Sequence, residues 1–240
     1  MNIKAPLKYQ LRDYFKSIFY FYLWLVLIVS LLVISSAAAS SDGYVFMTHE
    51  LMSAVYVLVL GLCGHREYFH IFTQSGISRK TFFVSRLAAM LIAALALTFI
   101  DQILYITAFF ISQHLPHYQA VSFAHGSFVG DAFSFSLFGA ISYFFALIAV
   151  YSFGSFLNLI YYRLEKMGKV IFSLCAPFLF SAILPFLDYS FFGNRLSRLV
   201  SNIINFVSSG PLPAMAVFSL LAAVFLAGSW ILTRRAPVKI

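Results

Sequence analysis

The stretch Gly64–Arg86, GHREYFHIFTQSGISRKTFFVSR, gathers charge between two long apolar runs, and the rest of the chain is organised around it. Within it, His65–Gln74 is predicted to form a short helix. Ser75-Gly76 is expected to end that helix, because glycine tolerates the left-handed conformation common at helix ends. Ser78 is then placed to cap the next helix by accepting a hydrogen bond from a free backbone N–H. We therefore expect a short helix lying across a membrane surface, held at both ends by spanning helices.

Composition places the chain among polytopic membrane proteins. It has 240 residues, of which 62% are hydrophobic and 10% charged, and its mean hydropathy is +0.91. A soluble domain is about half apolar and a quarter charged. The net charge of +8 does not indicate a nucleic-acid partner, because the basic residues gather in loops on one side of the apolar runs. Basic charge in that position sets membrane orientation and attracts anionic lipid.

Six apolar runs are long enough to cross the hydrocarbon layer, which takes roughly 20 helical residues. The predicted spans cover 18–39, 45–61, 82–111, 131–161, 170–187 and 212–232. The whole chain, 1–240, is therefore expected to form a single all-α transmembrane domain. In the fifth span, Pro177 and Pro185 are expected to kink the helix, because proline removes a backbone hydrogen bond.

Two amphipathic segments lie outside these spans. Residues 1–17 repeat a basic side chain at every fourth position, which predicts an N-terminal interfacial helix; the alternative is a basic flank that only orients the first span. The basic residues are Lys4, Lys8, Arg12 and Lys16. Between spans five and six, 188–213 is predicted to contain an outer interfacial or re-entrant helix. Its apolar face consists of Leu196, Leu199, Val200, Ile203 and Val207.

The distribution of positive charge predicts the orientation of the chain. Of the 16 Lys and Arg residues, only Arg195 and Arg198 fall on one side of the predicted spans. The positive-inside rule places the other side, with both termini, in the cytoplasm. An even number of spans agrees with this orientation.

Motifs for nucleotide and metal chemistry are not recognisable. Gly168-Lys169 is followed by Val170, and Arg163 stands where the first glycine of a nucleotide-binding loop belongs. We therefore expect a chain that is not an enzyme and that binds no cofactor of its own. No metal site is predicted either, since the three histidines after the third span match no ligand spacing and are interpreted as part of a solvated loop. They are His114, His117 and His125.

Polar side chains inside the predicted spans include three that lie at similar depths toward the outer face. They are Glu50, Asp101 and Gln102. Because polar groups in the membrane interior are costly, these residues are candidates for a substrate path. The alternative is that they form hydrogen bonds to neighbouring helices and only specify packing.

The run 75–83, SGISRKTFF, enters a long apolar helix and resembles the same region of permease subunits of bacterial type-2 ABC exporters. The resemblance extends to the layout of about six spans. It implies that the short helix between spans two and three is a coupling helix, which docks on a separate ATPase subunit carrying ATP and Mg²⁺. The alternative is a generic basic cytoplasmic loop with a glycine turn.

The resemblance also implies which residues couple to the ATPase. These are His65, Arg66, Glu67, Tyr68, Phe69, Phe72, Gly76, Ser78 and Arg79. We expect the aromatic residues among them to fill pockets on the ATPase or to lie against lipid headgroups, and Arg66 and Glu67 to lie at the rim of the contact. Because ABC systems hydrolyse ATP with a pair of ATPase domains, we also expect a second copy of this chain or a sister permease.

The predicted function is therefore export of a hydrophobic or amphipathic substrate, such as an antimicrobial peptide, a drug or a lipid, across the bacterial cytoplasmic membrane. A separate ATPase supplies the energy, and the chain contributes a multi-pass permease with no covalent chemistry. The alternative is a non-transporting membrane scaffold, a sensor or an unfamiliar membrane enzyme. Co-purification of an ATPase subunit distinguishes the two classes.

Overall fold

The computed structural model describes residues 3–38, 45–63, 65–114, 118–120, 122, 137–178, 184–190 and 193–234. The elements are α1 (Lys4–Ala38), β1 (Val45–Met47), α2 (His49–Leu62), α3 (His65–Gln74), α4 (Arg79–Ser112), β2 (Tyr118–Ala120), α5 (Leu137–Arg163), α6 (Lys166–Phe178), α7 (Leu184–Ser190), α8 (Arg195–Ser208) and α9 (Pro211–Arg234). The described part is thus almost entirely helical. The short strands β1 and β2 are an exception to the all-helical prediction, and they pair in parallel with Val45 opposite Tyr118.

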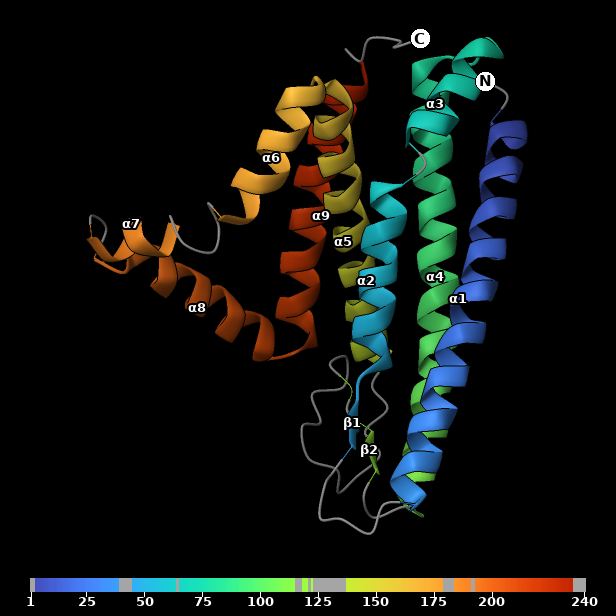
Figure 1. Cartoon of the computed structure of the whole chain (residues 1–240), viewed down its shortest axis with the longest axis vertical. Helices are drawn as coiled ribbons and strands as arrows, with labels where there is room; N and C mark the ends of the chain where they lie inside the picture. The colour runs from blue at the N-terminus through green and yellow to red at the C-terminus, as the bar shows by residue number, and fades with distance from the viewer. Residues whose placement is uncertain are drawn as a thin grey trace.

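Four helices are long and apolar enough to cross a membrane: α1, α4, α5 and α9. They correspond to the first, third, fourth and sixth predicted spans. In the bundle α5 packs against α2 and α9, while α4 packs against α1 and α5. The start of α1, α3 and the end of α9 lie at one end of the bundle, and the β1–β2 pair lies at the other (Figure 1). The chain is a membrane protein by these features.

The second and fifth predicted spans are not found as long helices, so six spans are not confirmed. Val45–Met47, the predicted start of the second span, is the strand β1, and α2 has 14 residues. The helix α6 has 13 residues and α7 has 7, and 179–183 between them lie outside the described residues. Helices of that length cover only about 20 Å, less than the roughly 30 Å of hydrocarbon. Within the fourth predicted span, 131–136 lies outside the described residues.

The N-terminal interfacial helix is not a separate element. The helix α1 runs unbroken for 35 residues, from the basic segment through the first predicted span. At 1.5 Å per residue it is about 52 Å long, so it extends well beyond the hydrocarbon layer at one end. The four basic side chains of 1–17 are exposed, whereas Tyr14 and Ile18 on the opposite face are buried in the main core of the protein.

The helix α3 and the turn after it form as predicted. The N–H of Gly76 donates to Thr73 O and the N–H of Ile77 donates to Phe72 O, at 3.1 Å and 2.9 Å, which closes a Schellman motif. Gly76 has a φ of +74°, in the left-handed region where glycine carries no side-chain penalty. Ser78 Oγ accepts from the N–H of Thr81 at 3.2 Å and caps α4. The connection from α3 to α4 is therefore short and is fixed by hydrogen bonds at the end of α3 and at the start of α4.

The helices α6, α7 and α8 extend away from the bundle beside α9 and form a lateral arm (Figure 1). Along α8 no residue is buried, and the side chains of its predicted apolar face are largely exposed. The predicted amphipathic helix between spans five and six is therefore present. Its place at the outer membrane surface stays a prediction.

Candidate functional site

The carboxylate of Asp101 joins four helices in the middle of the bundle. Asp101 lies on α4 and is completely buried. Its Oδ1 accepts hydrogen bonds from Tyr22 on α1 at 2.8 Å and from Ser53 on α2 at 2.9 Å. Its Oδ2 accepts from Tyr143 on α5 at 2.7 Å. We call these four residues, with His49 and Glu50, the Asp101 cluster.

His49 and Glu50, the first two residues of α2, complete this cluster. The imidazole Nε2 of His49 lies 3.0 Å from the backbone oxygen of Asp101, and Ser122 Oγ donates to Glu50 Oε1 at 2.6 Å. All three side chains are buried, as is that of Gln102. Glu50 and Asp101 thus lie at one level of the bundle, as predicted. Satisfied hydrogen bonds on a buried carboxylate match the packing alternative, and a role of these residues in a substrate path stays a prediction.

The hydroxyl groups that donate to the Asp101 carboxylate were not predicted from the sequence. Tyr22, Ser53 and Tyr143 come from three different helices, 42 to 79 positions away from Asp101. The available signal was the presence of tyrosine phenols in the middle of apolar runs, since a buried phenol needs a hydrogen-bond partner. A carboxylate at a similar depth in another span is the natural partner.

A second buried polar group lies nearer the end of the bundle that carries α3. Arg86 is only 5% exposed, although the charge pattern groups it with the cytoplasmic residues. Its Nε donates to the hydroxyl of Tyr151 at 3.0 Å and its Nη2 donates to Gly61 O at 3.2 Å. The Tyr151 hydroxyl in turn lies 2.8 Å from that of Tyr14 on α1. Helical spacing places Arg86 on the buried face of α4, in line with Phe82.

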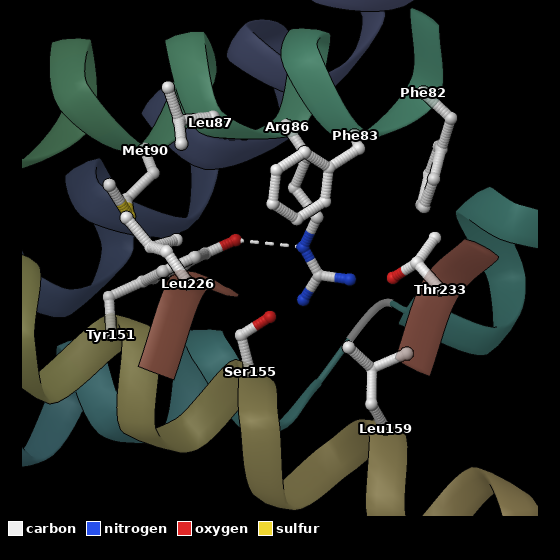
Figure 2. Close-up of a pocket in the computed structure, with 10 residues that line it drawn as sticks. All are labelled: Phe82, Phe83, Arg86, Leu87, Met90, Tyr151, Ser155, Leu159, Leu226 and Thr233. Atoms are coloured by element: carbon white, nitrogen blue, oxygen red, sulfur yellow. Dashed lines mark hydrogen bonds between the residues drawn. The ribbon is translucent and has the colours of Figure 1, made fainter. Parts of the chain in front are cut away.

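The guanidinium of Arg86 points into a cavity of about 20 Å³ between α4, α5 and α9 (Figure 2). Ser155 and Thr233 line this cavity together with apolar side chains. A polar cavity of this size has room for about one water molecule. It is too small for a substrate, so we regard it as part of the packing around Arg86.

Close approach of α2 and α5 brings Gly61 within reach of Arg86. A Cβ added at Gly61 would lie 2.6 Å from Tyr151 O, and a Cβ added at Gly154 would lie 2.6 Å from Leu58 O. Only glycine fits at these two positions, because any side chain would push the two backbones apart.

The predicted coupling aromatics lie inside the protein. Phe69 is 2% and Phe72 is 5% exposed, and both pack with Phe82 of α4 and Tyr162 of α5. The expectation that they fill pockets on a partner or lie against headgroups is therefore wrong for these two residues. The physical reason is that α3 packs against its own bundle. The apolar side chains of α4 and α5 belong to the same chain, so they cover these rings without the entropy cost of binding a partner.

Tyr68 connects α3 to α1. Its hydroxyl donates to Asp13 Oδ2 at 3.0 Å, and its ring meets that of Tyr9 edge-on. Burial and the hydrogen bond to Asp13 raise the pKa of Tyr68 well above that of a free tyrosine. The phenol therefore stays a neutral donor at any physiological pH.

The described part of the outward surface of α3 combines one aliphatic side chain with polar and small residues. Ile71 is 41% exposed, and Gln74, Ser75 and Gly76 are exposed beside it. Arg79 is also exposed, and its Nη1 donates to Arg234 O at 2.8 Å, which ties the start of α4 to the end of α9. The side chains of three predicted coupling residues lie outside the described residues. They are His65, Arg66 and Glu67.

Within the described residues, no group of three or more His, Cys, Asp or Glu side chains is placed to hold a metal ion. Comparison of the chain with models of protein families, with curated proteins and with solved structures gave no match.

Proposed function

We propose that this chain is the permease subunit of an ATP-driven ABC exporter, which moves a hydrophobic or amphipathic substrate across the bacterial cytoplasmic membrane. The observation that carries the proposal is α3, a short helix at the end of the bundle where both described chain ends lie (Figure 1). A separate ATPase brings ATP and Mg²⁺. The permease contributes two conformations that the ATPase biases.

The contacts of α3 support its role in transmitting force. Phe69 meets Phe82 of α4 at a ring distance of 5.6 Å and Tyr162 of α5 at 6.1 Å. Tyr68 holds Asp13 of α1. A displacement of α3 would therefore act on three long helices at once. The Schellman turn adds a stiff connection to α4, because its backbone groups are paired.

The docking surface in this proposal differs from the one expected from sequence. The inner aromatic residues of α3 pack against the bundle and are not available to a partner. The ATPase therefore contacts the outward surface at Ile71 and Gln74, beside exposed Arg79 and Lys80. A single exposed aliphatic residue surrounded by polar groups is typical of a small anchor within a polar rim. Two permease chains, identical or related, would present two such surfaces to a pair of ATPase domains.

The test is purification of the tagged chain from its native membrane in mild detergent, followed by measurement of bound ATPase and of ATP hydrolysis. The double variant Ile71→Glu/Gln74→Glu should lose at least about tenfold of the bound ATPase while inserting normally, since anchor residues are worth about 2 kcal/mol or more. Asn202→Glu, on exposed α8, is the matched control and should bind as the wild type does.

Two results would overturn the proposal. If no ATPase co-purifies with the wild-type chain and the preparation does not hydrolyse ATP, the chain is a scaffold, a sensor or an unfamiliar membrane enzyme. If the double variant on α3 retains its ATPase in full, α3 is only a connection between α2 and α4.

A further inference from the structure

An apolar groove between α1 and α4 is lined by residues within 25–34 and 104–111. These segments lie in the half of each helix that is far from α3 (Figure 1). The volume of the groove is about 320 Å³, within the range of sites for small molecules. Aliphatic side chains from 25–34 of α1 and 104–111 of α4 form its walls, and His49 of the Asp101 cluster also lines it. Over these ranges the groove extends about 10 to 14 Å along the helices.

The polar atoms of this groove are acceptors. The hydroxyls of Ser30 and Thr107 donate to Leu27 O and Leu104 O of their own helices, each at 2.8 Å, so only their oxygen lone pairs remain. The Asp101 carbonyl can only accept, so the Nε2 of His49 carries the proton of that contact. In the neutral ring Nδ1 is then an acceptor, and it forms no hydrogen bond with another described residue.

We propose that the groove binds a neutral amphiphile of the fatty-alcohol class, with its chain between α1 and α4 and its hydroxyl donating to Nδ1 of His49. An alkane of equal length would leave that acceptor unsatisfied, which costs affinity. A carboxylate would meet no fixed donor among the described lining residues, and burial of its charge is expensive. An alcohol supplies one donor and no charge.

This site goes beyond the proposed function and assumes neither an ATPase nor transport. Its lining is also distinct from the general lipid-facing surface of α4. Leu95, for example, is 63% exposed on the outside of that helix and has no part in the groove. Nonspecific contact with acyl chains would occur at both places, whereas the proposed site depends on His49.

The experiment uses the purified full chain in lipid nanodiscs and a photoactivatable 1-decanol carrying a diazirine. Labelled peptides are mapped by mass spectrometry, with unlabelled 1-decanol, decane and decanoate at pH 8 as competitors. We expect labelling in 25–34 and 104–111, with 1-decanol competing at least tenfold better than decane or decanoate. Val29→Trp or Ala108→Phe should fill the groove and remove at least nine tenths of the labelling. Leu95→Trp is the matched control and should label normally.

His49 variants test the hydrogen bond separately from the groove. His49→Phe should keep the labelled peptides and reduce the preference for decanol over decane to less than threefold. His49→Gln should retain the preference, because its amide can donate to the Asp101 carbonyl and still offer an oxygen. Equal competition by decane and decanol in the wild type would overturn the proposal. So would labelling that survives both groove-filling variants in protein that elutes as the wild type does, or an unchanged preference in His49→Phe.

Discussion

Single residues tie the helices of this bundle together at two levels. Asp101 accepts from hydroxyls on three other helices, and Arg86 donates to Tyr151, whose hydroxyl meets that of Tyr14. Each charged group is held by neutral hydroxyls, which can adjust their protons without moving heavy atoms. The two levels lie on the same helix, α4, and together they connect it to α1, α2 and α5 at both depths.

The first prediction concerns the Asp101 carboxylate. Asp101→Leu should leave Ser53 without its acceptor and the two tyrosine hydroxyls with only longer contacts to backbone oxygens, at 3.2 Å and 3.4 Å. We expect stability to fall by about 1–3 kcal/mol, the cost of an unsatisfied buried polar group. Asp101→Asn keeps one acceptor oxygen and should cost less. Thermal unfolding of the purified protein in one detergent, with both variants side by side, measures the difference. Equal stability of Asp101→Leu and the wild type would contradict the hydrogen-bond network.

A second prediction separates the two faces of α3. Phe72→Ala should destabilise the protein by about 3–5 kcal/mol, as expected for truncation of a buried phenylalanine. Ile71→Ala, one residue away and 41% exposed, should change stability by about 1 kcal/mol or less. Denaturation curves of the isolated permease suffice, with no ATPase present. If Ile71→Ala is the more destabilising of the two, the orientation of α3 described above is wrong.

At the scale of elements, α8 is held by a carboxylate from the helix before it. Asn194 precedes α8 with a left-handed φ of +62° and makes no side-chain cap. Asp188 of α7 takes that role, because its two carboxylate oxygens accept from the N–H groups of Leu196 and Ser197, each at 2.8 Å. A negative charge at a helix N-terminus is also favoured by the helix dipole.

The third prediction follows from this cap. Burial acts to raise the pKa of Asp188, but the N–H donors of Leu196 and Ser197 outweigh it and lower the pKa below that of a free aspartate. A lowered pKa stabilises the folded form above the unfolded value of about 3.9, and this stabilisation is lost as the pH falls through the folded pKa. The first turn of α8 should therefore exchange its amide hydrogens faster at pH 3 than at pH 6, after correction for intrinsic rates.

Asp188→Asn is the control for this pH dependence. The variant should show weakened protection of the first turn of α8 at both pH values and no additional loss at low pH. A pH response that persists unchanged in Asp188→Asn would assign the titration to another group.

At the scale of the whole molecule, charge and the apolar groove occupy opposite ends. The start of α1, the start of α4 and the end of α9, which carry exposed basic residues, lie with α3 (Figure 1). The β1–β2 pair and the segments 25–34 and 104–111, which line the groove, lie toward the far end. This asymmetry is the basis for placing α3 in the cytoplasm by the positive-inside rule.

The fourth prediction tests that orientation. In a variant without the native Cys63 and Cys175, single cysteines at Lys4 and Gln74 should react with an impermeant thiol reagent only after the cells are opened. A cysteine at Thr48 or Gly210, at the other end of the bundle, should react in intact cells. Labelling of Lys4→Cys from outside would reverse the orientation and remove α3 from the reach of a cytoplasmic ATPase.

Local features of this protein were readable from sequence because short-range interactions determine them. The bounds of α3, the left-handed Gly76 and the Ser78 cap each depend on residues within about five positions. The four long apolar helices were equally clear, since membrane insertion selects for length and hydropathy along one continuous segment. The similar depth of Glu50 and Asp101 followed from counting residues along their helices.

Tertiary structure alone decided what these segments contact. The hydroxyls on Asp101, the burial of Arg86 and the inward turn of the α3 aromatics all arise between helices that are far apart in the chain. Hydropathy cannot show whether a phenylalanine faces lipid, a partner or its own bundle. The free energy of transferring the side chain from water is similar in all three places. Which surface covers it depends on how helices pack, and that depends on shape and on close approach at glycines such as Gly61 and Gly154.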